Sequence, residues 1–242
     1  MITLALPSIG NGPFSIVVEE GSPFASITPK MYVRSGQDGL GVGNMLLIHI
    51  AVKCWEPRLV QFSKSFHLKT SIAELLNEYT LWLKVPNCGN IMKKRLISGA
   101  TMLQYALSNE HSVRRAITYL AGLGFGLTPS GDDYLLGVMA SLWLTGNTSP
   151  LDEIAKESQR KTTSLSANFL KAGAKGEFSE SWHQLVQGIV SQDTKTAQNA
   201  ISKFAQIGAY SGRDALAGFA THLIGSKFSA RIDQKQNNVN GT

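Results

Sequence analysis

Residues 122–137 read GLGFGLTPSGDDYLLG, and this stretch decides how the second half of the chain folds. Five glycines, a Thr-Pro pair and two adjacent aspartates come directly before a long apolar run that ends at Gly146. The first backbone N–H groups of a helix have no partner within the helix, so Ser, Thr and Asp are preferred there as caps. The pattern therefore predicts a helix that starts near residue 130 and is buried on nearly all sides.

Two arrangements of this helix start fit the residues. In the first, Ser130 is the N-cap and Asp133 reaches back to it in a capping box. In the second, Thr128 is the N-cap and Pro129 takes the first helical position, where its missing N–H costs nothing. Capping alone therefore explains part of the motif, whichever arrangement holds.

Asp132 and the glycines exceed what capping requires, because several glycines together indicate positive φ or a close approach of the backbone to a ligand. A glycine loop that enters a helix is a ready anion site. Consecutive helical residues diverge by about 100°, so we expect Asp132 to face a pocket and Asp133 to serve the local structure. The candidate catalytic residues are Asp132 and Asp133, and the candidate ligand-binding residues of the loop are Gly124, Gly126, Thr128, Ser130 and Gly131.

A partial copy of the motif follows later in the chain. SGRDALAG at 211–218 repeats SGDDYLLG at 130–137 in five of eight positions, and both precede an apolar helical pattern. The copy predicts a second helix start that faces the first, and it adds Ser211, Gly212 and Asp214 to the candidate ligand-binding residues. Capping alone explains Ser211 and Asp214 equally well. A third Ser-Gly-x-Asp at 35–38 is followed by GLGVG, so no helix is expected there.

The chain changes character near residue 70. Before it, the β-rich runs 14–20 and 44–55, a further run from Val60 through Phe62 to Phe66, and Gly- and Pro-rich turns predict a small antiparallel sheet. After it, helical spacing recurs over 70–84, 91–108, 112–124, 150–176, 179–191, 193–208 and 211–225. We therefore predict an α+β fold with a β-rich region 1–69, a larger helical region 70–228 and a polar tail 229–242.

Composition excludes several classes of protein. The 242 residues are 43% hydrophobic and 17% charged, which is typical of a globular protein. The net charge of +6 is scattered along the chain, so we expect no nucleic-acid binding. The sequence shows neither a run of about 18 apolar residues nor a basic, apolar leader, so we expect no membrane segment and no secretory signal. Cys54 and Cys88 form no motif, and a reduced cytoplasmic protein is expected.

The pattern G-x-G-x-G-L-T-P-S-x-D-D leading into an apolar helix resembles the AllH-like family, whose named member is a subunit of the bacterial oxamate carbamoyltransferase. Two further blocks agree in order, TSLSANFLKAGAKGEFSE at 163–180 and IGAYSGRDALAGF at 207–219, and the likeness covers about residues 110–225. The resemblance implies a cytoplasmic protein of purine or allantoin catabolism that works with other subunits. It also implies a small anionic substrate and the conversion of oxalurate and phosphate to oxamate and carbamoyl phosphate.

Three functions remain open on the sequence. The first is a carbamoyltransferase subunit that binds its ligand at the 130–133 turn, and the second is a non-catalytic scaffold or regulatory subunit of such a complex. The third is a hydrolase in which Asp132 and Asp133 hold Mg²⁺, the one candidate cofactor, because that cation would bridge a carboxylate and a phosphate.

Overall fold

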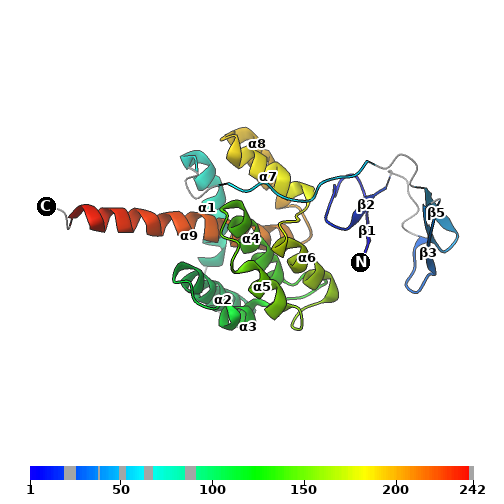
Figure 1. Ribbon diagram of the computed structural model, residues 1–242, viewed down its shortest axis with the longest axis horizontal. Coiled ribbons are helices and arrows are strands. Elements are labelled where there is room, and N and C mark those ends of the chain that lie inside the picture. The colour runs from blue at the N-terminus through cyan, green and yellow to red at the C-terminus, as the bar shows by residue number, and fades with distance from the viewer. Residues whose placement is uncertain (19–25, 38, 49–52, 63–67, 85–90, 240–242) are drawn as a thin grey trace. The chain divides into compact units, whose positions relative to one another are not determined.

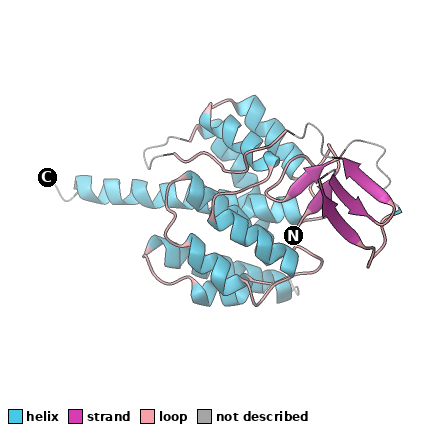
Figure 2. Cartoon of the chain, turned by 45° about the vertical axis from the view of Figure 1, so that its right-hand side comes forward, coloured by secondary structure: helices cyan, strands magenta, loops and turns pink. Residues whose placement is uncertain are grey.

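The computed structural model describes residues 1–18, 26–37, 39–48, 53–62, 68–84 and 91–239. The chain forms two compact units, one of residues 2–56 and one of residues 57–242 together with Met1. The first unit carries the strands and the second carries the helices (Figure 2). The predicted α+β fold is therefore confirmed.

The N-terminal unit holds two separate sets of paired strands. β3 (Val33–Gly36), β4 (Gly39–Val42) and β5 (Met45–Ile48) form an antiparallel sheet in that order. A small antiparallel sheet was predicted, but of these strands only β5 lies in a run predicted as a strand, 44–55, and β3 and β4 lie in a stretch predicted as turns. β1 (Thr3–Ala5) and β2 (Ser15–Val17) form a parallel pair that the sequence does not predict. The third Ser-Gly-x-Asp copy ends β3 rather than starting a helix, as expected, and its Asp38 lies outside the described residues.

The run expected as a further strand is an extended segment over residues 57–62. Its amides of Leu59 and Phe62 donate to the carbonyls of Gly176 (2.8 Å) and Leu144 (2.7 Å), and its bridge to Glu177 is isolated. Those carbonyls belong to the C-terminal ends of helices, which lack partners within the helix. The apolar pattern that predicts a strand here therefore reflects packing against helix ends. Phe66, the last residue of the predicted run, lies outside the described residues.

The helical unit is built around one central helix. Its described helices are α1 (Thr70–Lys84), α2 (Ile91–Ser108), α3 (Arg114–Leu120), α4 (Ser130–Leu144), α5 (Leu151–Ser158), α6 (Ser164–Ala174), α7 (Glu180–Val190), α8 (Thr194–Phe204) and α9 (Ser211–Val239). Figure 1 shows α4 in the middle, with α2 and α3 on one side and α7 and α8 on the other. Tyr134, Leu135 and Met139 of α4 are completely buried. The prediction that this helix is buried on nearly all sides is confirmed.

The largest differences from the expected helices are in the segment 150–176 and at the end of α9. The segment 150–176 is two helices, because the Thr163 hydroxyl accepts from the Ser166 amide (3.1 Å) and starts α6 anew. α9 continues past the expected end near 225 to Val239, since no glycine or proline interrupts 226–239 and most residues there tolerate a helix.

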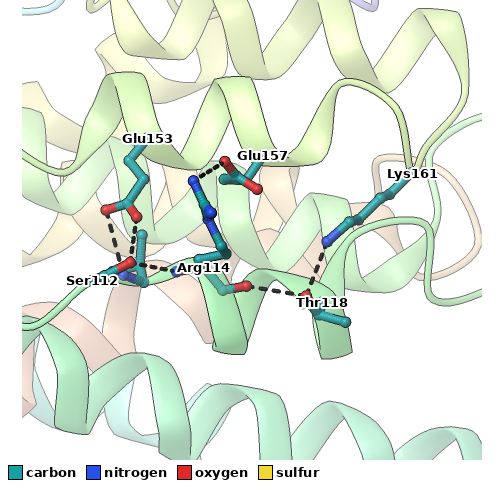
Figure 3. A network of polar contacts seen from close by, with 7 residues as sticks. Ser112, Arg114, Thr118, Glu153, Glu157 and Lys161 are labelled. Carbon is teal, nitrogen blue, oxygen red and sulfur yellow. Dashed lines mark hydrogen bonds and ion pairs between the residues drawn. The ribbon is translucent and has the colours of Figure 1, made fainter.

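A polar network fixes α3 against α5, and α3 leads directly into the glycine loop. The Glu153 carboxylate accepts from the Ser112 hydroxyl (2.5 Å), and Arg114 pairs with Glu157 (3.0 Å) (Figure 3). At the other end of α3, the Lys161 ammonium donates to the Thr118 hydroxyl (2.9 Å). The network therefore holds the chain at Lys161 beside the end of α3, where the loop begins.

Candidate functional site

The loop between α3 and α4 takes a shape that only glycine adopts easily. Gly122, Gly124 and Gly126 have φ angles of 70°, 130° and 88°, in the left-handed half of conformational space that side chains disfavour. A Cβ at Gly122 would overlap the carbonyl oxygen of Lys161, whereas nothing lies near the position of a Cβ at Gly126. Gly122 is therefore required by packing, and Gly126 leaves open space at an exposed part of the loop.

Asp132 closes this loop from inside. Its Oδ1 accepts from the Gly122 amide (2.9 Å), and its Oδ2 accepts from the Thr162 hydroxyl. Burial raises the pKa of Asp132, and hydrogen bonds from Thr162, Gly122 and Ser166 offset part of that rise. Both carboxylate oxygens are thus used by local structure, although the sequence indicates Asp132 as the acid that faces a pocket.

Neither predicted capping arrangement forms at the start of α4. The helix begins at Ser130 with Pro129 as the N-cap residue, and no side chain caps it. The amide of Asp133 donates to the carbonyl of Pro129 (3.1 Å), so it is not available to the Ser130 hydroxyl. The side chains of Ser130 and Asp133 are therefore not engaged in a capping box, and their polar atoms are left to other partners.

The second copy of the motif builds the same helix start in α9. The amide of Gly131 donates to Leu123 (2.8 Å), and the amide of Gly212 donates to Ile207 (3.0 Å) in the same way. A Cβ at either glycine would overlap a carbonyl oxygen of the preceding helix. Gly131 and Gly212 are thus packing positions, and the sequence repeat is a repeat of backbone structure.

The two helices cross with their backbones in contact. A Cβ at Gly137 would overlap the carbonyl oxygen of Ala215, and a Cβ at Gly218 would overlap that of Tyr134. These residues occupy equivalent positions in the two motif copies, so the crossing is close to symmetric. The hydroxyl oxygens of Thr128 and Ser211 lie 3.0 Å apart. The prediction that the two helix starts face each other is therefore confirmed.

Two acids lie beneath this junction, Asp133 from α4 and Asp214 from α9. They are only 8% and 1% exposed. Oδ2 of Asp133 and both oxygens of Asp214 have no hydrogen-bond partner among the described residues. Leaving a buried polar atom without a partner costs free energy, so these atoms are the ones that a ligand, an ion or a proton would satisfy.

The environment of the two acids favours their protonated forms. Burial raises the pKa of Asp133 to about 7, the negative charges of Asp214 and Asp132 add to the rise, and the hydroxyls of Ser211 and Thr128 oppose it. Burial also raises the pKa of Asp214 to about 6, against a smaller effect of the Ser130 hydroxyl. The Ser211 hydroxyl of α9 thus lowers the pKa of Asp133, and the Ser130 hydroxyl of α4 lowers the pKa of Asp214.

The surface above the acids is polar at its centre and apolar at its rim. The side chains of Thr128, Ser130 and Ser211 are half-buried, and the amides of Ser130 and Ser211 donate to no group among the described residues. Around them stand exposed apolar side chains: Phe125, Leu127, Ile207 and Tyr210. The junction therefore has two amides without a partner among the described residues, beside the hydroxyls of Thr128 and Ser211.

The predicted site residues separate into three groups. Thr128, Ser130, Asp133, Ser211 and Asp214 come together at the junction, and we call these five residues the paired helix starts. Gly124 and Gly126 belong to the loop beside them, while Asp132, Gly131 and Gly212 serve local packing and hydrogen bonding. Sequence reasoning missed Thr162, which binds Asp132, and Thr163, whose hydroxyl donates to the carbonyl of Leu127 (2.5 Å). The adjacent Thr162 and Thr163, directly before α6, are the sequence feature that could have indicated these contacts.

Other features of the described chain do not extend this site. No group of three or more His, Cys, Asp or Glu side chains is placed to hold a metal ion in the described ranges. A cavity of about 500 Å³ lies among Ser112, Asn147 and Glu153, near the opposite end of α4. Within the part of the chain that the structure describes, no helix has the length and apolar character needed to cross a membrane.

Comparison with known proteins tests the family resemblance directly. Residues 120–223 match the sequence model of a family described as oxamate carbamoyltransferase subunit AllH. That range runs from the end of α3 to within α9 and includes all of the paired helix starts. No solved structure matches the chain. The family whose model residues 120–223 match is the one that the glycine-rich motif resembles.

Proposed function

We propose that the chain is a subunit of a carbamoyltransferase of the oxamate type, and that the paired helix starts bind its small anionic or carbamoyl ligand. The reaction would transfer the carbamoyl group of oxalurate to phosphate, giving oxamate and carbamoyl phosphate. The match to the AllH family supports the first part of the proposal. The partners would be the other subunits of the complex, and the place of action would be cytoplasmic purine or allantoin catabolism.

The observation that carries the second part is the meeting of two helix N-termini over unpartnered acids. The Thr128 and Ser211 hydroxyls touch at 3.0 Å, which fixes both helix starts at one place. Helix N-termini attract anions through their free amides and their dipoles. Buried carboxylate oxygens accept hydrogen bonds from the N–H groups of a ureido or amide compound. One site therefore offers complementary groups to both halves of such a ligand.

The chemistry of the reaction suits this arrangement. Carbamoyl transfer needs the two reactants held in line and the developing oxyanion stabilised, which backbone amides provide. The amides of Ser130 and Ser211 supply those donors without any nucleophilic side chain. Partner subunits would complete the enclosure, since the apolar rim at Phe125 and Tyr210 is exposed in this chain.

Ligand binding to the full-length chain tests the proposal. Calorimetric titration with carbamoyl phosphate and with oxamate is expected to show binding by the wild type and a loss of at least about tenfold in Ser211→Ala, which removes one donor. Ser191→Ala is the matched control, because this exposed serine bonds only within the end of α7 (2.8 Å to Gln187). Equal binding by both variants would show that the paired helix starts do not hold the ligand.

A second candidate, a non-catalytic scaffold subunit, is favoured by one observation. The acids of the motif are almost completely buried, and the exposed groups around them are apolar side chains such as Leu127 and Tyr210. On this reading the loop docks to a partner and the acids serve only the helix junction. The double substitution Leu127→Ser and Tyr210→Ser would then abolish co-purification of the partner subunits, while Ser211→Ala would leave turnover of the complex unchanged.

A further inference from the structure

The linker between α5 and α6, residues 159–163, contacts the glycine loop at both ends of that loop. At the first end, the Thr162 hydroxyl donates to Oδ2 of Asp132, whose Oδ1 accepts from the Gly122 amide (2.9 Å). The carbonyl oxygen of Lys161 lies where a Cβ at Gly122 would stand. The beginning of the loop is therefore held by the linker, through one threonine hydroxyl that acts on Asp132.

At the second end, Thr163 of the same linker binds the loop directly. Its hydroxyl donates to the carbonyl of Leu127 (2.5 Å), and the hydroxyl of Ser166 donates to the same oxygen (3.4 Å). The Thr163 hydroxyl oxygen also accepts from the Ser166 amide (3.1 Å), and one hydroxyl is able to donate and accept at once. Leu127 directly precedes Thr128, whose hydroxyl oxygen lies 3.0 Å from that of Ser211. The start of α6 thus fixes the residue next to the paired helix starts.

Between these two ends the loop has little else to fix its shape. Gly124 and Gly126 have φ angles of 130° and 88°, and glycine takes positive and negative φ with similar ease, so backbone preference alone does not select this conformation. The amides of residues 124–128 donate to no group among the described residues. The side chains of Phe125 and Leu127 are 89% and 71% exposed. Selection of the loop conformation is therefore left largely to the hydrogen bonds from the linker.

We propose that Thr162 and Thr163 are positioning residues of the ligand site, which hold the glycine loop in the conformation in which Thr128 and the start of α4 receive the ligand. This inference rests on the proposed function. Neither threonine touches the ligand, because Thr162 acts through Asp132 and Thr163 acts through Leu127. Each contributes a hydroxyl donor, so serine replaces either residue, whereas valine has nearly the same shape and does not.

The loop conformation sets the affinity for the ligand through its population. A ligand that binds only one conformation shows an affinity reduced by the fraction of chains in that conformation. A valine at either position removes one hydrogen bond that favours the bound conformation. We therefore expect each valine substitution to weaken binding by about five- to tenfold.

Calorimetric titration of the full-length chain with oxamate and with carbamoyl phosphate tests the inference. Thr162→Val and Thr163→Val are expected to show the weakened binding, and Thr162→Ser and Thr163→Ser to bind within about twofold of the wild type, because serine keeps the donor. Thr101→Val is the matched control, since this exposed threonine of α2 bonds only to the Ile97 carbonyl of its own helix (2.9 Å). Wild-type affinity in both valine variants would overturn the inference.

A second control separates positioning from a general loss of stability. Thr162→Val leaves a carboxylate oxygen of Asp132 without its donor, and Thr163→Val removes the N-cap of α6, so both variants are expected to be less stable. Ile189→Val also lowers stability, because Ile189 is completely buried in α7, across α4 from α2 and α3 (Figure 1). At a temperature at which every variant is folded, Ile189→Val is expected to bind as the wild type does. An equal loss of affinity in this control would refute a positioning role.

Proteolysis of the loop gives a readout that needs no ligand. Chymotrypsin cleaves after aromatic and leucine residues, and Phe125 and Leu127 are exposed in the loop. Cleavage follows the population of locally opened chain, so we expect cleavage after these two residues to be at least about fivefold faster in Thr163→Val than in the wild type or Ile189→Val. Thr163→Ser is expected to restore the wild-type rate.

The failures of the two proposals are distinguishable. A wild type that binds neither oxamate nor carbamoyl phosphate would refute the proposed function, and the cleavage rates would then decide whether the threonines hold the loop. Equal cleavage of the wild type and Thr163→Val would show that they do not. A wild type that binds, with valine variants that bind equally well, would refute the positioning role and leave the proposed function intact.

Discussion

The substitution Asp133→Asn is expected to stabilise the protein at pH 8. Burial raises the pKa of Asp133 from 3.8 to about 7, so above pH 7 the folded chain holds an ionised carboxylate in an unfavourable place. Each pKa unit corresponds to about 1.4 kcal/mol, and a rise of roughly three units costs about 4 kcal/mol. Asparagine has nearly the same shape and removes this cost.

The raised pKa of Asp133 determines how the stability gain of Asp133→Asn depends on pH. A carboxyl group whose pKa is raised by folding favours the folded state at low pH, and that contribution is lost as the pH rises through the folded value. The advantage of Asp133→Asn is therefore about 4 kcal/mol at pH 8 and falls to about 1 kcal/mol at pH 4.5. Its physical origin is the ionised carboxylate alone, so it disappears once the wild-type group is protonated in both states.

Urea unfolding of the wild type and the variant at the two pH values measures this difference. The melting temperature at pH 8 is expected to rise by about 10 °C for a chain of this size. Asp152→Asn, at an exposed position of α5, should change stability by less than about 0.5 kcal/mol at both pH values. A variant that is less stable than the wild type at pH 8 would refute the reasoning, because it would show that the Asp133 carboxylate has a stabilising partner.

Three further substitutions test the packing around the site. Gly137→Ala places a Cβ against a backbone carbonyl of α9 and is expected to lower the free energy of unfolding in urea by at least about 3 kcal/mol. In the control Gly225→Ala the new Cβ meets only a side-chain oxygen at 3.6 Å, so this change should be neutral or stabilising. Equal effects of the two substitutions would contradict the close crossing of α4 and α9. Thr162→Val leaves Oδ2 of Asp132 without its hydroxyl donor and should lower the free energy of unfolding in urea by about 1–3 kcal/mol. An unchanged free energy of unfolding would mean that this hydrogen bond is not formed. His222 is buried with its pKa lowered to about 4 from 6.5. The stability of the wild type relative to His222→Gln should therefore fall by about 3 kcal/mol as the pH falls from 6.5 to 4. A difference that does not change with pH would exclude His222 as a cause.

Local sequence patterns predicted the helical half of the fold well. The spacing of apolar residues and the Gly146 stop located α4, and the repeated Ser-Gly-x-Asp located both helix starts. The local pattern gave a wrong prediction where contacts with a distant segment determine the backbone conformation. The extended run near Val60 looks like a strand because it is apolar, but its hydrogen-bond partners are helix ends more than 80 residues away.

The candidate site residues stay a prediction, and the sequence did not show which of them form hydrogen bonds within the chain. The sequence brought Asp132, Asp133 and Asp214 into one list, because all three follow a helix-start pattern. The hydrogen bonding of the Asp132 carboxylate depends on Thr162, 30 residues further along the chain, and on the α3–α5 network that positions it. No periodicity or local spacing contains that information, so the hydrogen bonds of Asp132, and the lack of a partner for Oδ2 of Asp133 among the described residues, were visible only in the structure.

The central claim is that a small ligand binds where the starts of α4 and α9 meet. Titration of the isotope-labelled chain with oxamate, followed by the amide NMR signals, tests it most directly. The account predicts saturable shifts in the amides of Gly126, Ser130 and Ser211, in both motif copies at the same ligand concentration. Shifts confined to Ser112, Asn147 and Glu153, around the cavity near the far end of α4, would contradict it.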